Sequence, residues 1–222
     1  MTSIADNLQA IRARLGGTRR VTLLAVSKSQ PVKLIEEAVA ARQRAFGENY
    51  VQEAIEKMDA LRAAGSELEW HLIGPLQSNK TRIVAERFDW VQSVASEKIA
   101  HRLSEQRPAG MPPLNVLIQV NASGEATKSG ARADEVKSLV DRVRNLKGIR
   151  LRGLMAIPEP GADRLRYRSV KALYDSLKDE YGFDTLSLGM SDDMDVAIAE
   201  GSTMVRVGTA IFGARKTHKS AA

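Results

Sequence analysis

Cysteine is absent from the 222-residue sequence. Its absence excludes disulfide bonds, cysteine nucleophiles and metal sites built on thiolates. Histidine is also scarce, because only His71, His101 and His218 occur and they are widely separated along the chain. Transition-metal sites usually need clusters of histidine, cysteine and acidic side chains. We therefore expect no metal site in this protein.

Aromatic residues and long apolar runs are scarce as well. Phe, Trp and Tyr make up 5% of the chain, which leaves few rings to stack on the bases of a single-stranded nucleic acid. No apolar run approaches the roughly 18 residues of a membrane span. The N-terminal stretch, which includes Asp6, lacks the apolar segment of a signal peptide. We expect a cytoplasmic protein that binds neither membranes nor nucleic acids.

The net charge of +6 comes from dispersed basic residues, with modest clusters at 12–20, 142–152 and 216–219. We interpret them as a solvated surface with a mild preference for anions. Hydrophobic residues make up 43% of the chain, which is typical of a globular protein with a sizeable core. We expect one domain over residues 1–222 that ends in a short basic tail, 214–222.

Strand-like and helix-like segments alternate along the chain. Apolar residues at helical spacing predict an N-terminal helix over about residues 3–16, which two glycines end. A further helix opens at Pro31, and others are expected at about 51–64, 79–87, 96–106, 134–146, 162–181 and 192–200. Between them, apolar runs predict strands at 21–26, 44–47, 69–73, 89–94, 114–120, 149–155, 185–188 and 204–207.

This alternation is typical of a parallel α/β protein. Eight strand–helix units in about 200 residues fit a single TIM (β/α)8 barrel. A doubly wound open sheet is the alternative, but no G-x-G-x-x-G sequence follows the first strand. The barrel is therefore the predicted fold.

Polar residues follow the predicted strands at their carboxyl ends, where a barrel builds its chemistry. Lys28 comes directly after the first strand. A lysine at a strand end is usually there because its ammonium prefers water, so its role depends on what the other strand ends bring near it. Those ends carry Asn49, the 74–75 turn, Ser93, Asn121, the 155–158 turn, Ser191, Arg206, Gly208 and Thr209.

The loops after the seventh and eighth strands have the composition of a phosphate site. Gly189 and Gly208 would let backbone N–H groups approach an anion, and the hydroxyls of Ser191 and Thr209 would add donors. Ser191 also stands at the expected start of a helix, whose dipole favours an anion. As an alternative, Ser191 is a plain helix N-cap and Gly208 forms a plain turn; the two interpretations are compatible.

Arg206 alternates with two valines in a buried strand, so its guanidinium needs an acceptor, either a structural carboxylate or a ligand. A desolvated lysine near another cation has a lowered pKa and can serve as a nucleophile toward carbonyl groups. Lys28 opposite a phosphate cradle therefore predicts a Schiff-base site for a phosphorylated aldehyde.

Five segments are similar to one known family. They are Leu24-Ala-Val-Ser-Lys28, Phe46-Gly-Glu-Asn49, Trp70-His-Leu-Ile-Gly-Pro-Leu-Gln-Ser-Asn-Lys80, Gly189-Met-Ser-Asp-Asp193 and Val205-Arg-Val-Gly-Thr-Ala-Ile-Phe-Gly213. Together they resemble the pyridoxal phosphate homeostasis protein family, and the resemblance runs from about residue 4 to residue 213. It implies a single barrel of PLP fold type III, like the N-terminal domain of bacterial alanine racemase.

The resemblance implies that Lys28 holds pyridoxal 5′-phosphate (PLP) as a Schiff base. It also implies that the phosphate is bound by Ser191, Gly208 and Thr209. The ring would contact Asn49 and Arg206, and Met190 would form part of the pocket wall. Arg206 would face the pyridine nitrogen. His71 is equally compatible with a pocket wall and with a plain strand position, so we leave it out of the site.

An arginine at the pyridine nitrogen donates a hydrogen bond without giving up its proton, which makes the ring a weaker electron sink. The sequence ends about nine residues after Gly213, so we expect the C-terminal β-domain of alanine racemase, and the second base from it, to be absent. We therefore interpret the protein as a non-catalytic PLP carrier, acting as a monomer with apo PLP-dependent enzymes as candidate partners. Through them it would affect amino-acid and keto-acid balance. The alternatives are a PLP-dependent amino-acid racemase and an aldolase that uses Lys28 without PLP.

Overall fold

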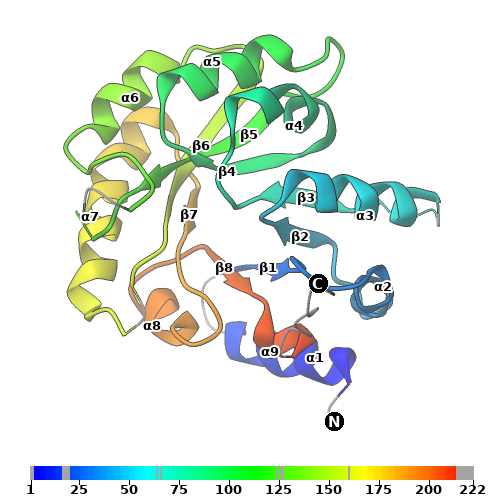
Figure 1. Ribbon diagram of the computed structural model, residues 1–222. Helices are drawn as coiled ribbons and strands as arrows, with labels where there is room; N and C mark the ends of the chain where they lie inside the picture. The colour runs from blue at the N-terminus through cyan, green and yellow to red at the C-terminus, as the bar shows by residue number, and fades with distance from the viewer. Residues whose placement is uncertain are drawn as a thin grey trace, which may run out of the picture.

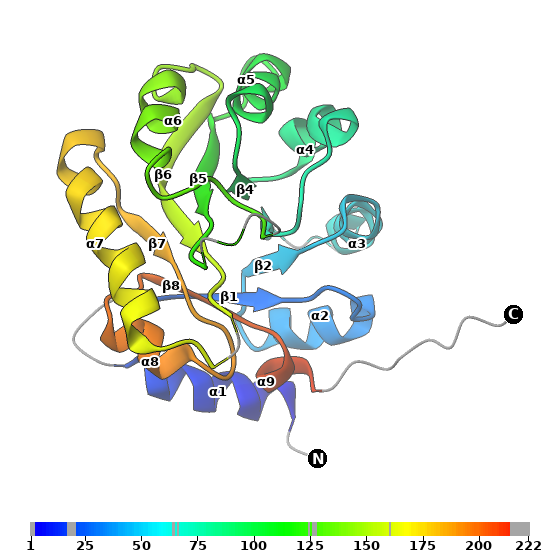
Figure 2. The same ribbon diagram turned by 60° about the vertical axis from the view of Figure 1, so that its left-hand side comes forward.

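The computed structural model describes residues 3–16, 21–63, 65, 67–123, 125, 128–159 and 161–213. Within these ranges, eight parallel strands close into a barrel in the order β1 to β8, and helices surround it (Figures 1 and 2). The predicted (β/α)8 barrel is confirmed, and the open-sheet alternative is wrong. The predicted basic tail, 214–222, lies outside the described residues.

The strands are β1 (Thr22–Val26), β2 (Ala45–Glu48), β3 (Glu69–Leu72), β4 (Trp90–Val94), β5 (Leu114–Val120), β6 (Ile149–Ala156), β7 (Thr185–Ser187) and β8 (Met204–Val207). The helices are α1 (Ile4–Leu15), α2 (Val32–Ala40), α3 (Val51–Ala63), α4 (Thr81–Arg87), α5 (Glu97–Gln106), α6 (Val136–Val143), α7 (Arg164–Tyr181), α8 (Met194–Ala199) and α9 (Thr209–Phe212), and a 3-10 turn, η1 (Ser78–Lys80), precedes α4.

Pairing between the first and last strands closes the barrel. Thr22 of β1 lies opposite Met204 of β8, and the register continues to Ala25 opposite Val207. Because paired parallel strands run in one direction, the loops after β1 and β8 leave the barrel at the same end. α1 lies beside α9 in both views (Figures 1 and 2), and the Asn7 side-chain amide donates to the main-chain oxygen of Ile211 at 2.9 Å.

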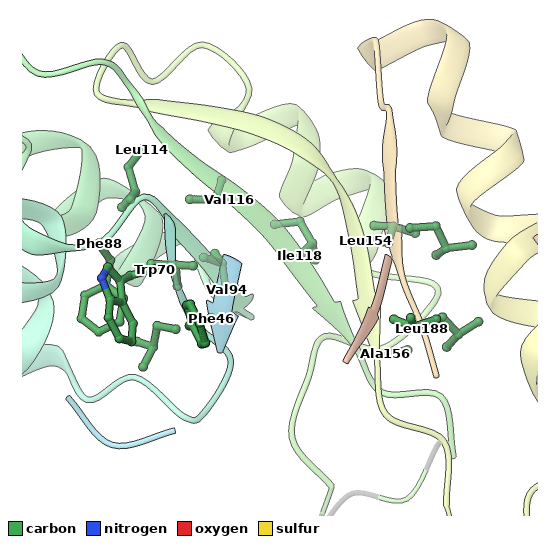
Figure 3. Packing of buried hydrophobic residues seen from close by; sticks show 14 of the residues in the cluster. Phe46, Trp70, Phe88, Val94, Leu114, Val116, Ile118, Leu154, Ala156 and Leu188 are labelled. Carbon is green, nitrogen blue, oxygen red and sulfur yellow. The ribbon is translucent and has the colours of Figure 1, made fainter. Parts of the chain in front are cut away.

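Apolar side chains fill the layer between the strands and the helices. Figure 3 shows part of it, where Phe46, Trp70 and Phe88 cluster on one side of the sheet. The Phe46 and Trp70 rings lie 5.6 Å apart between centroids. Each fully buried side chain of this size stabilises the fold by about 1.5–3 kcal/mol relative to exposure.

The barrel interior is more polar than this outer layer. Leu24 and Met204 belong to one small apolar cluster and Trp90 to another. Between them lie buried side chains that hydrogen-bond across the barrel, such as Ser187 of β7 and Gln92 of β4. β4 and β7 are not neighbours in the sheet, so their side chains meet only through the interior.

Some helix ends differ from the sequence expectations. Pro31 is the N-cap of α2 and not its first helical residue. The helix expected at 79–87 begins with the 3-10 turn Ser78–Lys80, and α6 is shorter than the expected 134–146. Helix ends are set partly by tertiary contacts, so local pattern places them only approximately. Among the described residues, no helix is long and apolar enough to span a membrane.

Candidate functional site

The predicted site residues gather in one cavity at the carboxyl end of the barrel. The cavity has a volume of about 210 Å³, and its lining includes all seven residues that the sequence singled out: Lys28, Asn49, Met190, Ser191, Arg206, Gly208 and Thr209. Lys28 lies in the turn that follows β1, two residues beyond Val26. Apolar lining comes from Val26, Ile73 and Ile157. Concave sites with apolar walls and a few convergent polar groups are typical of small-molecule binding.

The loops after β7 and β8 form one edge of this cavity. The Thr209 hydroxyl donates to the Ser191 hydroxyl oxygen at 3.2 Å, which joins the two loops. A Cβ atom at Gly208 would lie 3.3 Å from the main-chain oxygen of Val26, so the loop passes close to β1. Hydroxyl and main-chain donors at glycine-rich turns match the acceptor oxygens of a phosphate monoester. The donor set therefore fits a phosphate group.

Asp193, and not Ser191, precedes the helix after β7. α8 begins at Met194 with Asp193 as its N-cap, so the expectation of a helix start at Ser191 is wrong. The Asp193 carboxylate accepts from the Tyr167 hydroxyl at 2.6 Å and from the Met190 main-chain N–H. These two bonds hold residues 190–193 in place. The Ser191 hydroxyl is thus turned toward Thr209 and the cavity instead of capping a helix.

Gly189 is required by the backbone at the start of the same loop. Its φ is +95°, a conformation that favours glycine, and an added Cβ would lie 2.4 Å from the Cβ of Ala197. The loop therefore turns sharply against α8. A larger residue at this position would force the loop or α8 to shift.

Arg206 enters the cavity from β8 and is only 3% exposed. Its Nη1 donates to the Ser187 hydroxyl oxygen at 2.7 Å, and its Nη2 donates to the main-chain oxygen of Ala156 at 2.9 Å. Burial lowers the pKa of Arg206 to about 10, so the guanidinium stays charged at neutral pH. The sequence predicted a carboxylate or ligand acceptor for this arginine, whereas these two acceptors are a hydroxyl and a carbonyl.

The turn that carries Lys28 rests on a buried charge cluster under α3. Lys57 is 5% exposed, and its ammonium donates to the main-chain oxygen of Ser27, to Glu48 and to Glu53, at 2.7, 2.7 and 2.5 Å. The Ser27 hydroxyl donates to the same Glu48 oxygen at 2.6 Å. Burial raises the pKa of Glu48, and the neighbouring Lys57 opposes that rise. The cluster fixes the residue that precedes Lys28.

The residue after Lys28 is fixed as well. The main-chain N–H of Ser29 donates to Glu53 at 2.6 Å, and Ser29 has a φ of +59°, which is uncommon for a residue other than glycine. Such backbone strain persists only where the surroundings hold it. Lys28 is therefore presented from a turn that is constrained on both sides.

A second cavity of about 280 Å³ adjoins the first, with Asn49, Ile73 and Ile157 in both linings. The side-chain oxygen of Asn49 is buried and has no hydrogen-bond partner among the described residues. Asn121, one of the residues expected at the strand ends, lines this second cavity. Ser93 lies within β4, at 8% exposure, and lines neither cavity.

Sequence reasoning missed several residues that support the site. Ser187 and Gln92 hold Arg206 from inside the barrel, and Tyr167 and Asp193 hold the loop after β7. Lys57 was also missed, because it follows Glu53 by four residues, a spacing that usually marks an exposed ion pair on a helix. Among the described residues, no group of three or more His, Cys, Asp and Glu side chains is placed to hold a metal ion.

Comparisons with known proteins agree with this geometry. The family model described as "Alanine racemase, N-terminal domain" matches residues 1–216. The chain is 53% identical over 225 residues to the pyridoxal phosphate homeostasis protein of Pseudomonas aeruginosa, covering 97% of each chain. It is 52% identical to the protein of that name from Escherichia coli K12, covering 99% of this chain and 97% of that protein.

Among solved structures, the chain is similar to PipY of Synechococcus elongatus with PLP bound. The TM-score is 0.86 at 36% identity, and the match covers 95% of this chain and 100% of that one. Alanine racemase from Corynebacterium glutamicum matches with a TM-score of 0.73 at 19% identity, covering 97% of this chain and 61% of that one. This second similarity is one of fold alone.

Proposed function

Since the chain belongs to the pyridoxal phosphate homeostasis protein family, we propose that it binds PLP in the cytoplasm and buffers or delivers this cofactor without catalysing a reaction on it. The observation that carries the proposal is the convergence of Lys28, Arg206 and the Ser191–Thr209 pair on one cavity. The solved PLP complex of PipY, at 36% identity, supports the same choice of ligand.

Each group in the cavity has a role that its chemistry suits. The ε-amine of Lys28 would bond covalently to the cofactor aldehyde, with loss of water. Ser191, Thr209 and the backbone at Gly208 would bind the phosphate, and Arg206 would donate to the pyridine nitrogen. The side-chain oxygen of Asn49, which has no partner within the described part of the chain, would accept a hydrogen bond from a ring substituent. The remaining contact is apolar, through the partly exposed Met190.

The carrier role rests on how these residues handle protons. When bound, PLP supplies an aldehyde and a pyridine ring that withdraws electrons. Because the pKa of Arg206 is about 10, its guanidinium keeps its protons at neutral pH and would leave the ring nitrogen of bound PLP unprotonated. Among the described lining residues, Asp192 is the only carboxylate, and the sequence has no cysteine. Efficient carbanion chemistry needs a stronger electron sink and a paired acid and base.

Borohydride reduction followed by peptide mass spectrometry tests the binding. The reduction converts the bond between Lys28 and the cofactor to a stable amine, so we expect a phosphopyridoxyl group on Lys28. The Lys28→Ala variant, which should fold because its lysine lies in a turn, is the control and should carry no such group. If the wild-type protein is saturated with PLP and Lys28 remains unmodified, the proposed function fails.

An amino-acid racemase is the second candidate, because the family model described as "Alanine racemase, N-terminal domain" matches residues 1–216. A racemase would exchange the α-hydrogen of an added amino acid with solvent deuterium. We expect the PLP-loaded protein to leave the α-hydrogens of a saturating amino acid in place in D2O, as followed by proton NMR. Exchange that disappears in Lys28→Ala would replace the carrier proposal with the enzyme.

A further inference from the structure

A chain of hydrogen bonds crosses the barrel interior from Arg206 to the opposite end. Arg206 Nη1 lies 2.7 Å from the Ser187 hydroxyl, which lies 2.7 Å from Gln92 Oε1. Gln92 Nε2 lies 2.9 Å from His71 Nδ1, and His71 Nε2 lies 2.8 Å from Glu69 Oε1. Ser187, Gln92 and His71 are each fully buried, at 0% exposure, and Glu69 reaches solvent at the start of β3.

The chemistry at its two ends gives the chain one direction. A guanidinium only donates, so Ser187 must accept from Arg206 and must use its single proton toward Gln92. The Gln92 amide then presents its oxygen to Ser187 and its nitrogen to His71. A contact of 3.2 Å from Gln92 Nε2 to the Met204 sulfur, a weak acceptor, agrees with this orientation.

The same logic fixes the histidine. His71 Nδ1 accepts from Gln92, so the ring carries its proton on Nε2 and donates it to Glu69. The ring also stacks on Trp90, with centroids 5.1 Å apart and planes at 9°, and the Arg152 guanidinium lies 4.7 Å from the Trp90 ring centroid. Packing and hydrogen bonds thus leave the imidazole one orientation.

We infer that Gln92 and His71 are positioning residues for Arg206, although neither lines the cavity. With the Ser187 proton committed to Gln92, only lone pairs of that hydroxyl face Arg206. Ser187 and the Ala156 oxygen together fix the plane of the guanidinium. The direction in which Arg206 meets a ligand is therefore set by contacts on its far side. This inference rests on the proposed function, in which that ligand is the PLP ring.

The test compares Gln92→Leu with a matched control, Gln43→Leu. Both glutamines are buried, at 0% and 5% exposure, and Gln43 Nε2 donates to the main-chain oxygens of Leu23 and Ala45, away from Arg206. We expect Gln92→Leu to shift the absorption maximum of bound PLP and to speed PLP release roughly three- to tenfold, as the loss of one buried hydrogen-bond link would do. Gln43→Leu should change thermal stability without moving the spectrum.

A second readout needs no cofactor. In ligand-free protein with 15N-labelled histidine, His71 should show one protonated ring nitrogen, Nε2, and one acceptor nitrogen, Nδ1. This pattern should change in Gln92→Leu and persist in Gln43→Leu, with His71→Asn used to assign the signals. A His71 ring protonated on Nδ1 in the wild-type protein would overturn the chain.

The two readouts separate this inference from the proposed function. If the wild-type protein carries no PLP on Lys28, the proposed function fails, and the histidine signals still report on the chain. If the wild-type protein binds PLP and Gln92→Leu leaves its spectrum and release rate unchanged, the positioning role is wrong and the carrier proposal stands. If Gln92→Leu does not fold, Ser187→Ala is tested instead, because it removes the hydroxyl between Gln92 and Arg206. Ser187→Thr, which keeps a hydroxyl, is its control.

Discussion

The ammonium of Lys57 lies 2.7 Å from the main-chain oxygen of Ser27, the residue before Lys28. The same ammonium contacts Glu53, whose carboxylate accepts from the main-chain N–H of the residue after it, Ser29. A helix outside the barrel therefore determines the position of a turn at its mouth. This contact makes α3 part of the site although none of its residues lines the cavity with Lys28.

Replacing Lys57 with methionine should destabilise the fold. The change leaves Glu48, which is fully buried, without its cation, and breaking a buried ion pair on one side typically lowers stability by about 3–5 kcal/mol. Urea unfolding of Lys57→Met, with the exposed Lys33→Met of α2 as control, measures the loss. The double variant Lys57→Met/Glu48→Gln should recover part of it, and equal stability of the single and double variants would contradict the account.

Removal of the Ser191 hydroxyl should weaken PLP binding. A hydrogen bond to a charged group contributes about 1.5–3 kcal/mol, so the dissociation constant of Ser191→Ala should rise accordingly in a fluorescence titration of PLP-free protein. Ser176→Ala, in which the lost hydroxyl bonds only within α7 in the described structure, is the control. An unchanged affinity would remove Ser191 from the phosphate site.

Replacing Gly189 with alanine should destabilise the protein more than replacing Gly182 with alanine. Both glycines have a positive φ, at +95° and +67°, but a Cβ at Gly182 would have open space while one at Gly189 would meet Ala197 at 2.4 Å. Backbone strain alone costs on the order of 1 kcal/mol, so Gly182→Ala measures that part by itself. Gly189→Ala should lose more stability and also PLP affinity; similar results for both variants would show that the clash is relieved without effect.

The acid sensitivity of the fold should depend on Glu69. The hydrogen bond from His71 holds the pKa of Glu69 below its ordinary value of 4.5, against the opposing effect of burial. A carboxyl group whose folded-state pKa is depressed stabilises the fold above its unfolded pKa and loses that contribution as pH falls through the folded value. The wild-type protein should therefore exceed Glu69→Gln in unfolding free energy at pH 7, and the gap should close below pH 4.5. A gap that is constant with pH would exclude this linkage.

The sequence predicted the barrel because its signals are local: an apolar run at each strand and turn residues at each strand end. It also predicted which residues meet around Lys28, since a barrel brings all carboxyl ends of its strands to one face. The roles of those residues in binding PLP remain predictions.

The sequence could not predict contacts that depend on three-dimensional packing. Ser187 and Gln92 are far apart in the chain, and nothing in either strand marks them as partners. Ser191, Asp192 and Asp193 are all good N-cap residues in a row, so local pattern could not choose among them. In the structure Asp193 is the N-cap, and its carboxylate accepts a hydrogen bond from Tyr167, which lies 26 residues earlier in the chain. In the same way, only packing shows that Lys57 is buried.

The seam between β1 and β8 joins the first and last strands of the barrel, so under the proposed function cofactor loading would depend on the completion of folding. Lys28 follows the first strand and Thr209 follows the last, and Thr22 pairs with Met204 roughly 180 residues away. Such a pairing has high contact order, and a long stretch of chain must close into a loop before its contacts can form. A growing polypeptide that already contains Lys28 thus lacks the proposed phosphate ligands Gly208 and Thr209 until β8 and the turn after it are made. Under the proposed function, PLP would be captured only by chains whose barrel has closed.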